Sequence, residues 1–373
     1  ISLKGIFSNS TNNNQLKNLD VSALIKLRQL EVAGNQLTNI ALDKIPYLKS
    51  LKLAHNPWDQ KAYGYFKQRF YKSASTLDDS MFNGQIIYVE RYNADATTFP
   101  DPGFRECISK HVRNAKENAA TALKSLSCQS RLIKTITGLE KLSQLKQLSL
   151  FSSKINQINL NSFKHLVSLT LRNNKIKHLD LSGTPSLKVL EVKNSQLEKI
   201  TFDESHDLIY IDIQNNQLKN LTIHSMPSLT KLFANDNQID QFSHGDFPEM
   251  THLKLSNNSL ATLDTGNFEN LKYLYLDKNN IANIYLVPLK KLETVVINDN
   301  FLKHVDLSKL KALKGAYLFN NHELLPELTN VDLEHIRVDS FQFEHMRKTG
   351  QLSEYEHVDN YQPNRYFLKR NIE

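Results

Sequence analysis

The stretch Leu271–Ile281 reads LKYLYLDKNNI, and an earlier stretch, Leu166–Ile176, reads LVSLTLRNNKI. Both have apolar residues at positions one, four, six and eleven and an asparagine at position nine. Counting forward from Leu145 in steps of 21 residues reaches an apolar residue every time: Leu166, Leu187, Leu208, Leu229, Met250, Leu271, Leu292 and Leu313. The same pattern therefore continues in register from about residue 145 to about residue 325.

A fixed period of about 20 to 29 residues with this order of apolar positions and an asparagine is the signature of a leucine-rich-repeat solenoid. The alternating apolar residues of each copy predict a short strand with one buried face. Stacked copies then form a parallel concave sheet. We expect the side chains at position nine to form a ladder that hydrogen-bonds the backbone of neighbouring coils. These are Ser153, Asn174, Ser195, Asn216, Asn237, Asn258, Asn279, Asn300 and Asn321. A catalytic or glycan-binding ladder is the alternative.

The second half of each copy carries an apolar-polar-apolar triplet, which predicts a second short strand rather than a helix. The triplets are 158–160, 179–181, 200–202, 221–223, 263–265, 284–286 and 305–307. Pro185, Pro227 and Pro248 each predict a turn before the next copy. The predicted fold is thus a β-rich horseshoe of the α/β class, with a parallel concave sheet, a mostly extended convex side and small helical caps.

The 21-residue unit, of the form LxxLxLxxNxLxxLDLxx, resembles the short bacterial class of leucine-rich repeats over about two thirds of the chain. A second resemblance covers about fifty residues. It begins with Phe99-Pro100-Asp101, continues through a predicted helix and ends with Gly138-Leu139-Glu140 followed by Leu142 and Leu145. This order of motifs is similar to the N-terminal cap and first coil of secreted internalin-like repeat proteins of bacteria. The resemblance implies that a second array, with its own cap, starts here.

The internalin-like resemblance also gives the two cysteines a role. It places Cys107 on the cap helix and Cys128 on the first strand, and so implies a disulfide between them. Two free buried thiols are the alternative. A disulfide that closes a loop of about twenty residues would stabilise the cap by roughly 3 kcal/mol. It would also place the protein outside the reducing cytosol.

Breaks in the period divide the chain into four predicted segments: residues 1–58, 59–122, 123–325 and 326–373. The first is a short repeat array, and the third is the main array of about nine to ten coils. The second holds an aromatic helix at 59–71, a strand at 85–89, a linker and the second N-terminal cap. The fourth holds a closing helix at 341–347 and a tail, 353–373, that covers the edge of the sheet. Because the chain begins at Ile1 rather than methionine, we expect a mature or trimmed product.

The composition and motifs argue against several classes of function. The net charge of +7 comes from interspersed residues, which is not typical of a nucleic-acid-binding arm. There is no apolar run of about eighteen residues, so we expect no membrane span. Isolated glycines exclude a phosphate loop, and Pro326 replaces the second histidine of a zinc-protease motif that begins at His322. Cys107 and His111 could imitate a thiol dyad, but a cap cysteine beside a surface histidine fits better. We predict no catalytic, cofactor or metal site.

The candidate site is a surface. Outward positions on the concave strands collect aromatic residues in the later coils, with basic residues nearby. Because the core positions are already filled, these aromatics are expected to be exposed, which is the composition of a binding hot spot. The alternative is the general preference of strands for aromatic residues. The predicted protein-binding residues are Arg172, Lys193, Tyr210, Lys231, Phe233, His252, Lys254, Tyr273, Tyr275, Tyr317 and Phe319.

These features together predict a non-enzymatic, protein-binding repeat protein of bacteria that is secreted, periplasmic or attached to the cell surface. Its partner would be a protein, such as a host or cell-surface protein, gripped on the concave sheet. One alternative is an effector delivered into the host cytoplasm, in which the repeats target an enzymatic domain elsewhere. Another is an extracellular animal receptor fragment, with glycosylation acceptors at Asn9, Asn220 and Asn257.

Overall fold

A computed structural model describes the chain in two units. The described residues are 15–27, 29–32, 34–45, 50–52, 56–57, 59, 62, 96–112, 120–151, 153–203, 207–325, 333–353, 355–358 and 365–370. One compact unit is Ile1–Asn93 with Val112–Glu117, and the other is Ala94–His111 with Asn118–Glu373. The predicted strand at 85–89 and most of the predicted helix at 59–71 lie outside the described residues. The four predicted segments follow the phase of the repeat, and their boundaries stay a prediction.

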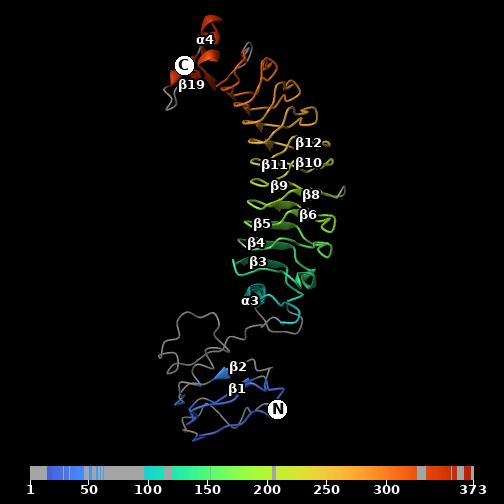
Figure 1. Ribbon diagram of the computed structural model, residues 1–373, viewed down its shortest axis with the longest axis vertical. Helices are drawn as coiled ribbons and strands as arrows, with labels where there is room; N and C mark the ends of the chain where they lie inside the picture. Colours follow the sequence, from blue (N-terminus) through green and yellow to red (C-terminus); the bar gives the residue numbers. More distant parts are fainter. Residues whose placement is uncertain are drawn as a thin grey trace. The chain divides into compact units, whose positions relative to one another are not determined.

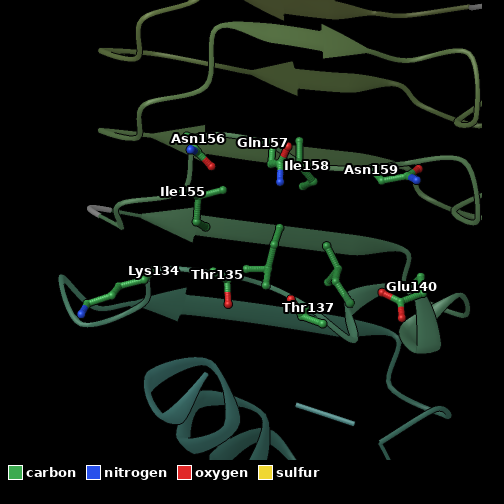
Figure 2. Close-up of a pocket in the computed structure, with 11 residues that line it drawn as sticks. Lys134, Thr135, Thr137, Glu140, Ile155, Asn156, Gln157, Ile158 and Asn159 are labelled. Atoms are coloured by element: carbon green, nitrogen blue, oxygen red, sulfur yellow. The ribbon is translucent and has the colours of Figure 1, made fainter. Parts of the chain in front are cut away.

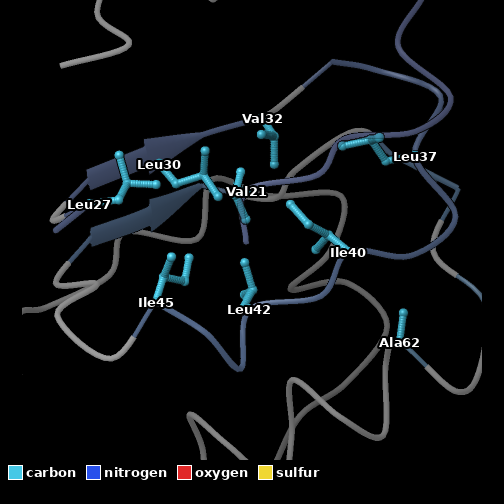
Figure 3. Packing of buried hydrophobic residues seen from close by; sticks show 9 residues of the cluster. All are labelled: Val21, Leu27, Leu30, Val32, Leu37, Ile40, Leu42, Ile45 and Ala62. Carbon is cyan, nitrogen blue, oxygen red and sulfur yellow. The ribbon is translucent and has the colours of Figure 1, made fainter. Parts of the chain in front are cut away.

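The described residues of the first unit include two strands with the predicted 21-residue offset. Strands β1 (Gln29–Glu31) and β2 (Ser50–Lys52) are parallel neighbours. Behind them lies a buried apolar cluster, which Figure 3 shows: Val21, Leu27, Leu30, Val32, Leu37, Ile40, Leu42, Ile45 and Ala62. The Asn56 amide donates to the Val32 carbonyl, 24 residues earlier, at 2.7 Å. The asparagine ladder therefore operates in this array too.

The second unit is built on one long sheet. Within the described residues, thirteen strands form it, and neighbours from β3 to β17 are parallel (Figure 1). In spatial order they are β3 (Ser125–Gln129), β4 (Gln147–Phe151), β5 (Ser168–Arg172), β7 (Val189–Glu191), β9 (Tyr210–Asp212), β11 (Lys231–Phe233), β13 (His252–Lys254), β14 (Tyr273–Tyr275), β15 (Thr294–Val296), β16 (Gly315–Tyr317), β17 (His335–Asp339), β19 (Arg365–Arg370) and β18 (Tyr355–Val358). The predicted parallel concave sheet and the leucine-rich-repeat solenoid are confirmed.

The convex side is extended, as predicted, but only part of it pairs into strands. Strand β6 (His178–Asp180) pairs with β8 (Lys199–Thr201), and β10 (Asn220–Ile223) pairs with β12 (Gln241–His244). The predicted strands at 158–160, 263–265 and 284–286 do not form. Side chains replace backbone pairing at one of these coils, where the Thr265 hydroxyl donates to the Tyr285 carbonyl.

The position-nine ladder is confirmed as a structural device. Asn279 shows the pattern: its amide donates to the carbonyls of Leu255 (3.0 Å) and Leu276 (2.9 Å), and its oxygen accepts from the N–H of Leu260 (3.0 Å). One buried side chain thus satisfies backbone groups of two adjacent coils. The asparagine amides are occupied by backbone partners, which argues against the catalytic or glycan-binding alternative. Asn174 departs from this pattern, because its buried side-chain oxygen has no hydrogen-bond partner among the described residues.

A second feature of the turn repeats with the same period. Among the described non-glycine residues, eight have a positive φ of 49° to 57°, and each precedes a ladder position. They are Asn173, Asn194, Asn215, Asp236, Asn257, Lys278, Asp299 and Asn320. Asparagine and aspartate tolerate this left-handed conformation better than other residues with side chains. Turn geometry therefore explains the first residue of the Asn-Asn and Asp-Asn pairs in the sequence, and the ladder explains the second.

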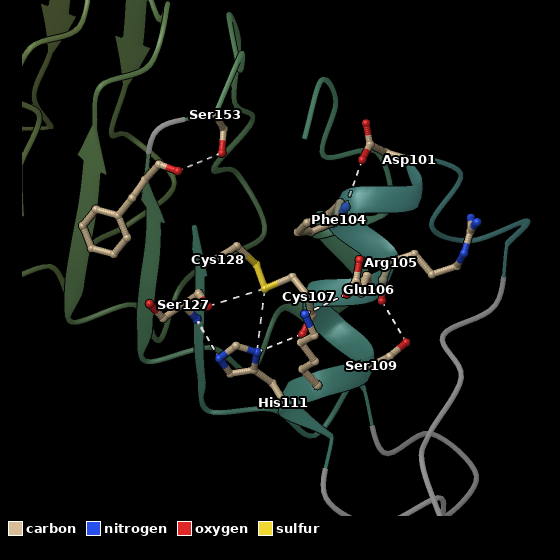
Figure 4. Close-up of a disulfide and its surroundings, with 12 residues drawn as sticks. Asp101, Phe104, Arg105, Glu106, Cys107, Ser109, His111, Ser127, Cys128 and Ser153 are labelled. Carbon is tan, nitrogen blue, oxygen red and sulfur yellow. Dashed lines mark hydrogen bonds and ion pairs between the residues drawn. A yellow bond between two sulfur atoms is a disulfide. The ribbon is translucent and has the colours of Figure 1, made fainter. Parts of the chain in front are cut away.

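The N-terminal cap of the second unit matches the prediction (Figure 4). Asp101 begins helix α3 (Pro102–His111): one carboxylate oxygen accepts from the N–H of Phe104 at 2.9 Å. The other accepts from the N–H groups of Lys134 (2.9 Å) and Thr135 (3.1 Å), so the side chain joins the helix to the first coil. Burial alone would raise the pKa of this carboxyl, but the backbone donors together hold it below its ordinary value.

The predicted disulfide joins Cys107 to Cys128 and so fastens α3 to β3. His111 supports the same contact, as Figure 4 shows. Its Nε2 accepts from the N–H of Ser127 at 3.4 Å, while Nδ1 lies 2.9 Å from the Cys107 carbonyl oxygen. The histidine thus bridges helix and strand, and the cysteine sulfur is bonded rather than nucleophilic. The thiol-dyad alternative is excluded.

Two short elements complete the caps. A 3-10 helix, η1 (Leu139–Leu142), follows Gly138, whose φ is +92°. A Cβ at Gly138 would lie 2.2 Å from the Thr98 carbonyl oxygen, so only glycine fits. The predicted closing helix is α4 (Ser340–Lys348), which begins with a capping box between Asp339 and Gln342. The predicted cover of the sheet edge is also present, because β19 pairs antiparallel with β17.

Candidate protein-binding face

The eleven predicted binding residues all lie on the concave sheet or directly after its strands. The strands β7, β11, β13, β14 and β15 share one pattern, in which the central residue is buried and its two neighbours are half-exposed. Ten of the eleven side chains are half-exposed, as expected. The register pairs Tyr210 with Lys231, Lys231 with His252, and His252 with Tyr273, so these outward positions lie side by side across the sheet.

Phe319 is the exception, and the prediction that it is exposed is wrong. Its side chain is only 8% exposed. The Arg365 guanidinium of β19 lies 4.3 Å from the centroid of its ring. The C-terminal antiparallel strand, which lies outside the repeat, therefore covers this aromatic residue.

The first basic residues of the face are neutralised within the sheet. Arg172 donates from Nε to Glu191 on a neighbouring strand at 3.0 Å, and Lys193 pairs with Asp212 at 2.5 Å. Asp212 is fully buried and also accepts from the Tyr210 hydroxyl at 3.0 Å. Burial and the Asp212 charge raise the pKa of the Tyr210 hydroxyl, which stays protonated. At this end of the face, the charged side chains are thus paired with one another.

The middle of the face is a cluster of aromatic and basic side chains. The rings of Tyr210 and Phe233 meet edge to face with centroids 5.6 Å apart. Lys254 lies between two rings, with Nζ 5.1 Å from the Phe233 centroid and 4.5 Å from the Tyr275 centroid. Such cation–π contacts hold a lysine in place while its ammonium remains charged. The cluster thus combines half-exposed rings with an ordered positive charge.

His252 and Tyr273 occupy the adjoining row, with ring centroids 4.6 Å apart. The Tyr273 hydroxyl donates to Glu293 at 3.1 Å, and Glu293 is also paired with Lys272 at 2.9 Å. Burial lowers the pKa of His252, and the nearby Lys231 and Lys254 lower it further. Glu293 opposes this shift, but the pKa of His252 remains below its ordinary value.

The structure extends the face beyond the predicted residues. Arg337 on β17 lies between the rings of Tyr317 (5.0 Å) and Phe367 (5.1 Å), and His335 meets the edge of Tyr317 at 5.7 Å between centroids. These residues escaped prediction because Gly315 pairs with His335 at an offset of 20 residues rather than 21. The aromatic and basic composition of the tail was the only signal in the sequence.

The second unit also contains a pocket away from the concave face, with few groups that could bind or react. A pocket of ≈ 480 Å³ lies between neighbouring coils, lined by residues 134–137, 139–140 and 155–159 (Figure 2). Its one acidic residue, Glu140, accepts from the N–H of Gly138 at 3.1 Å. Among the described residues, no three His, Cys, Asp or Glu side chains are grouped to hold a metal ion. None of the described helices has the length and apolar character needed to cross a membrane.

Comparisons with known proteins find similarity to other leucine-rich-repeat domains. Residues 99–216, which include the cap and the strands β3 to β9, match the family described as the leucine-rich-repeat domain of the endo-β-N-acetylglucosaminidase EndoS. No curated protein sequence matches significantly.

Among solved structures, the functional domain of InlJ from Listeria monocytogenes is 21% identical over 66% of this chain and 66% of its own, with a TM-score of 0.47. The leucine-rich-repeat domain of APL1B is 18% identical over 64% of this chain and 74% of its own, with a TM-score of 0.48. The internalin inlF from L. monocytogenes is 18% identical over 69% of this chain and 88% of its own, with a TM-score of 0.36. The repeat, the parallel sheet and the match of residues 99–216 together show that the second unit is a leucine-rich-repeat solenoid, similar in its cap and first coils to the EndoS domain.

Proposed function

We propose that the chain is a non-enzymatic recognition protein that binds a protein partner on the concave face of its second unit. The observation that carries the proposal is the group of half-exposed rings at Phe233, Tyr273, Tyr275 and Tyr317, which lie in two adjoining rows of the concave sheet. The apolar core does not need these side chains, because the buried positions of the same strands are filled by leucine and other small apolar residues. Aromatic residues beside ordered cations are typical of binding hot spots.

We further propose that the protein is exported or attached to a cell surface. The Cys107–Cys128 disulfide supports this location, because such bonds persist outside the reducing cytosol. The same bond weakens the alternative of an effector that works in host cytoplasm. The partner would then be another surface or extracellular protein.

A second candidate function follows from the match of residues 99–216 to a domain of a glycan-hydrolysing enzyme. In that case the repeats would be an accessory module that holds a substrate glycoprotein or positions a catalytic domain carried elsewhere. A fold alone does not choose between these functions. The concave face would still be the contact surface, and its partner would be the glycoprotein or the catalytic domain.

The test is a binding comparison between two double variants. In Tyr273→Ala/Tyr275→Ala, two central rings of the concave face are removed. In the matched control, Tyr285→Ala/Phe301→Ala, two exposed rings outside the concave strands are removed; they are 64% and 60% exposed. We expect the first variant to bind proteins captured from extracellular fluid or cell surfaces at least tenfold more weakly than the unmodified chain. We expect the control to bind normally.

Both variants should keep the unfolding midpoint of the parent within a few degrees, because neither pair is in the core. Equal binding by the concave variant and the parent would show that the face is assigned wrongly. Loss of binding in the control alone would show that the binding site lies outside the concave strands.

A further inference from the structure

One row of the concave sheet alternates rings and cations across successive strands. The strand register places the following residues side by side: Phe233, Lys254, Tyr275, Val296, Tyr317, Arg337 and Phe367. We refer to these seven residues as the ring–cation row. It crosses seven strands, from β11 to β19, and all of its members are at least partly exposed.

Each cation of the ring–cation row is held between two rings. Lys254 lies between Phe233 and Tyr275, and Arg337 lies between Tyr317 and Phe367, with distances from cation to centroid of 4.5 to 5.1 Å. A ring attracts a cation through its electron-rich face but carries no net charge. The two side chains are therefore ordered while their charges remain uncompensated.

Three other cations on this side of the second unit differ in this respect. Arg172, Lys193 and Lys272 each have a carboxylate partner in a neighbouring coil. Among the residues that the structure describes, Lys254 and Arg337 form no ion pair and no side-chain hydrogen bond. Asp277, two residues after the strand that holds Tyr275, instead accepts from the Ser256 hydroxyl. The aromatic half of the sheet thus contains positive charge that no described carboxylate neutralises.

The spacing of the two cations defines what they can bind together. Lys254 and Arg337 are four strands apart, and strands lie about 4.8 Å apart, so the two charges are separated by about 19 Å along the sheet. An extended peptide advances about 3.3 Å per residue. Two side chains about six residues apart would span that distance, and an even separation puts both on the same face of an extended segment.

We infer that the ring–cation row binds an acidic, extended segment of the partner protein, with one carboxylate on Lys254 and a second, about six residues away, on Arg337. This inference rests on the proposed function of the concave face. Charge complementarity argues for an anionic ligand. A polypeptide fits better than a glycan, because a sugar stacks on an open ring face and Lys254 and Arg337 already occupy faces of the rings beside them.

The experiment is a selection from a random twelve-residue peptide library displayed on phage, against the immobilised full chain. We expect the enriched peptides to carry two acidic residues about six positions apart. A synthetic copy of an enriched peptide should bind Lys254→Met/Arg337→Met at least tenfold more weakly than the unmodified chain. Methionine keeps an apolar stem between the rings while it removes the charge. Binding should also weaken as salt is raised, because the contact is ionic.

The matched control is Lys290→Met/Lys309→Met, which removes two exposed positive charges in turns outside the concave strands. It should bind the peptide within twofold of the unmodified chain. Both variants should show the circular dichroism and unfolding midpoint of the parent. A tenfold loss in the control as well would mean that overall charge, rather than the ring–cation row, attracts the peptide, and would overturn the inference.

The remaining outcomes separate this inference from the proposed function. Enriched peptides without acidic residues, whose binding depends on Tyr273 and Tyr275 but not on Lys254 and Arg337, would overturn the inference and leave the proposed function standing. Binding of sialylated glycans on an array through Lys254 and Arg337, with no peptide enriched, would overturn the polypeptide ligand. A selection that enriches nothing overturns it too, and the capture experiment with Tyr273→Ala/Tyr275→Ala then decides the proposed function separately.

Discussion

At the scale of single residues, the turn after each concave strand is controlled by two adjacent positions. The second supplies the ladder amide, and the first adopts a left-handed backbone conformation. Seven of the eight described non-glycine residues with positive φ at the first position are asparagine or aspartate, and Lys278 is the eighth, with φ of 56°. A lysine gains no local hydrogen bond that would favour this conformation, so strain of roughly 1 to 2 kcal/mol is expected there.

Replacing Lys278 with asparagine should therefore raise the free energy of unfolding by about 1 kcal/mol. The side chain is exposed, so the substitution removes no packing. Urea denaturation followed by circular dichroism measures the change. Lys175→Asn is the matched control, since Lys175 is also exposed but has no positive φ, and it should bring no gain. An unchanged midpoint for Lys278→Asn would show that the turn carries no strain.

At the scale of elements, the N-terminal cap of the second unit is held by three independent contacts. The disulfide and His111 join α3 to β3, and Asp101 joins the start of α3 to the backbone of the following turn. In a repeat array, each coil is stabilised mainly by its neighbours. The cap therefore protects the first coil, which has no preceding coil in the same sheet.

Removal of the disulfide by Cys107→Ala/Cys128→Ala should lower the free energy of unfolding by roughly 3 kcal/mol. The loss should appear first as faster amide hydrogen exchange in α3 and β3, and last in distant strands such as β14. Intact mass after alkylation checks the native bond: we expect no adduct before reduction and two after it. Two adducts without reductant would contradict the bond and revive the cytoplasmic alternative.

The elements also show what the sequence can and cannot predict. The 21-residue period was enough to predict the concave strands, the buried leucines and the asparagine ladder, because each repeats the same local environment. Strand β12 was missed because the polar His244 ends its triplet. Phe319 was misplaced and Arg337 overlooked because β17 and β19 leave the period. Pairing of Lys193 with Asp212 depends on side-chain reach between coils, which the pattern of residue types does not encode.

At the scale of the whole molecule, the positions of the charged residues say more about binding than the net charge does. The net charge is +7, but many cations are paired between coils, as are Lys272 with Glu293 (2.9 Å) and Lys314 with Glu334 (3.1 Å). Such exposed pairs stabilise by only about 0 to 1 kcal/mol each. Opposite charges at matching positions of adjacent coils still favour the correct register. Among the described residues, Lys254 and Arg337 form no such ion pair, and they contribute unneutralised positive charge to the concave face.

The most direct test of recognition by the concave face is site-specific photocrosslinking. A benzoylphenylalanine would replace Thr294, a half-exposed residue of β15 on the concave face, or Tyr285, which is 64% exposed outside the concave strands. Each protein would be illuminated with a captured partner and the adducts identified by mass spectrometry. We predict adducts from position 294 and none from position 285. Adducts from position 285 alone would contradict the assignment of the binding face.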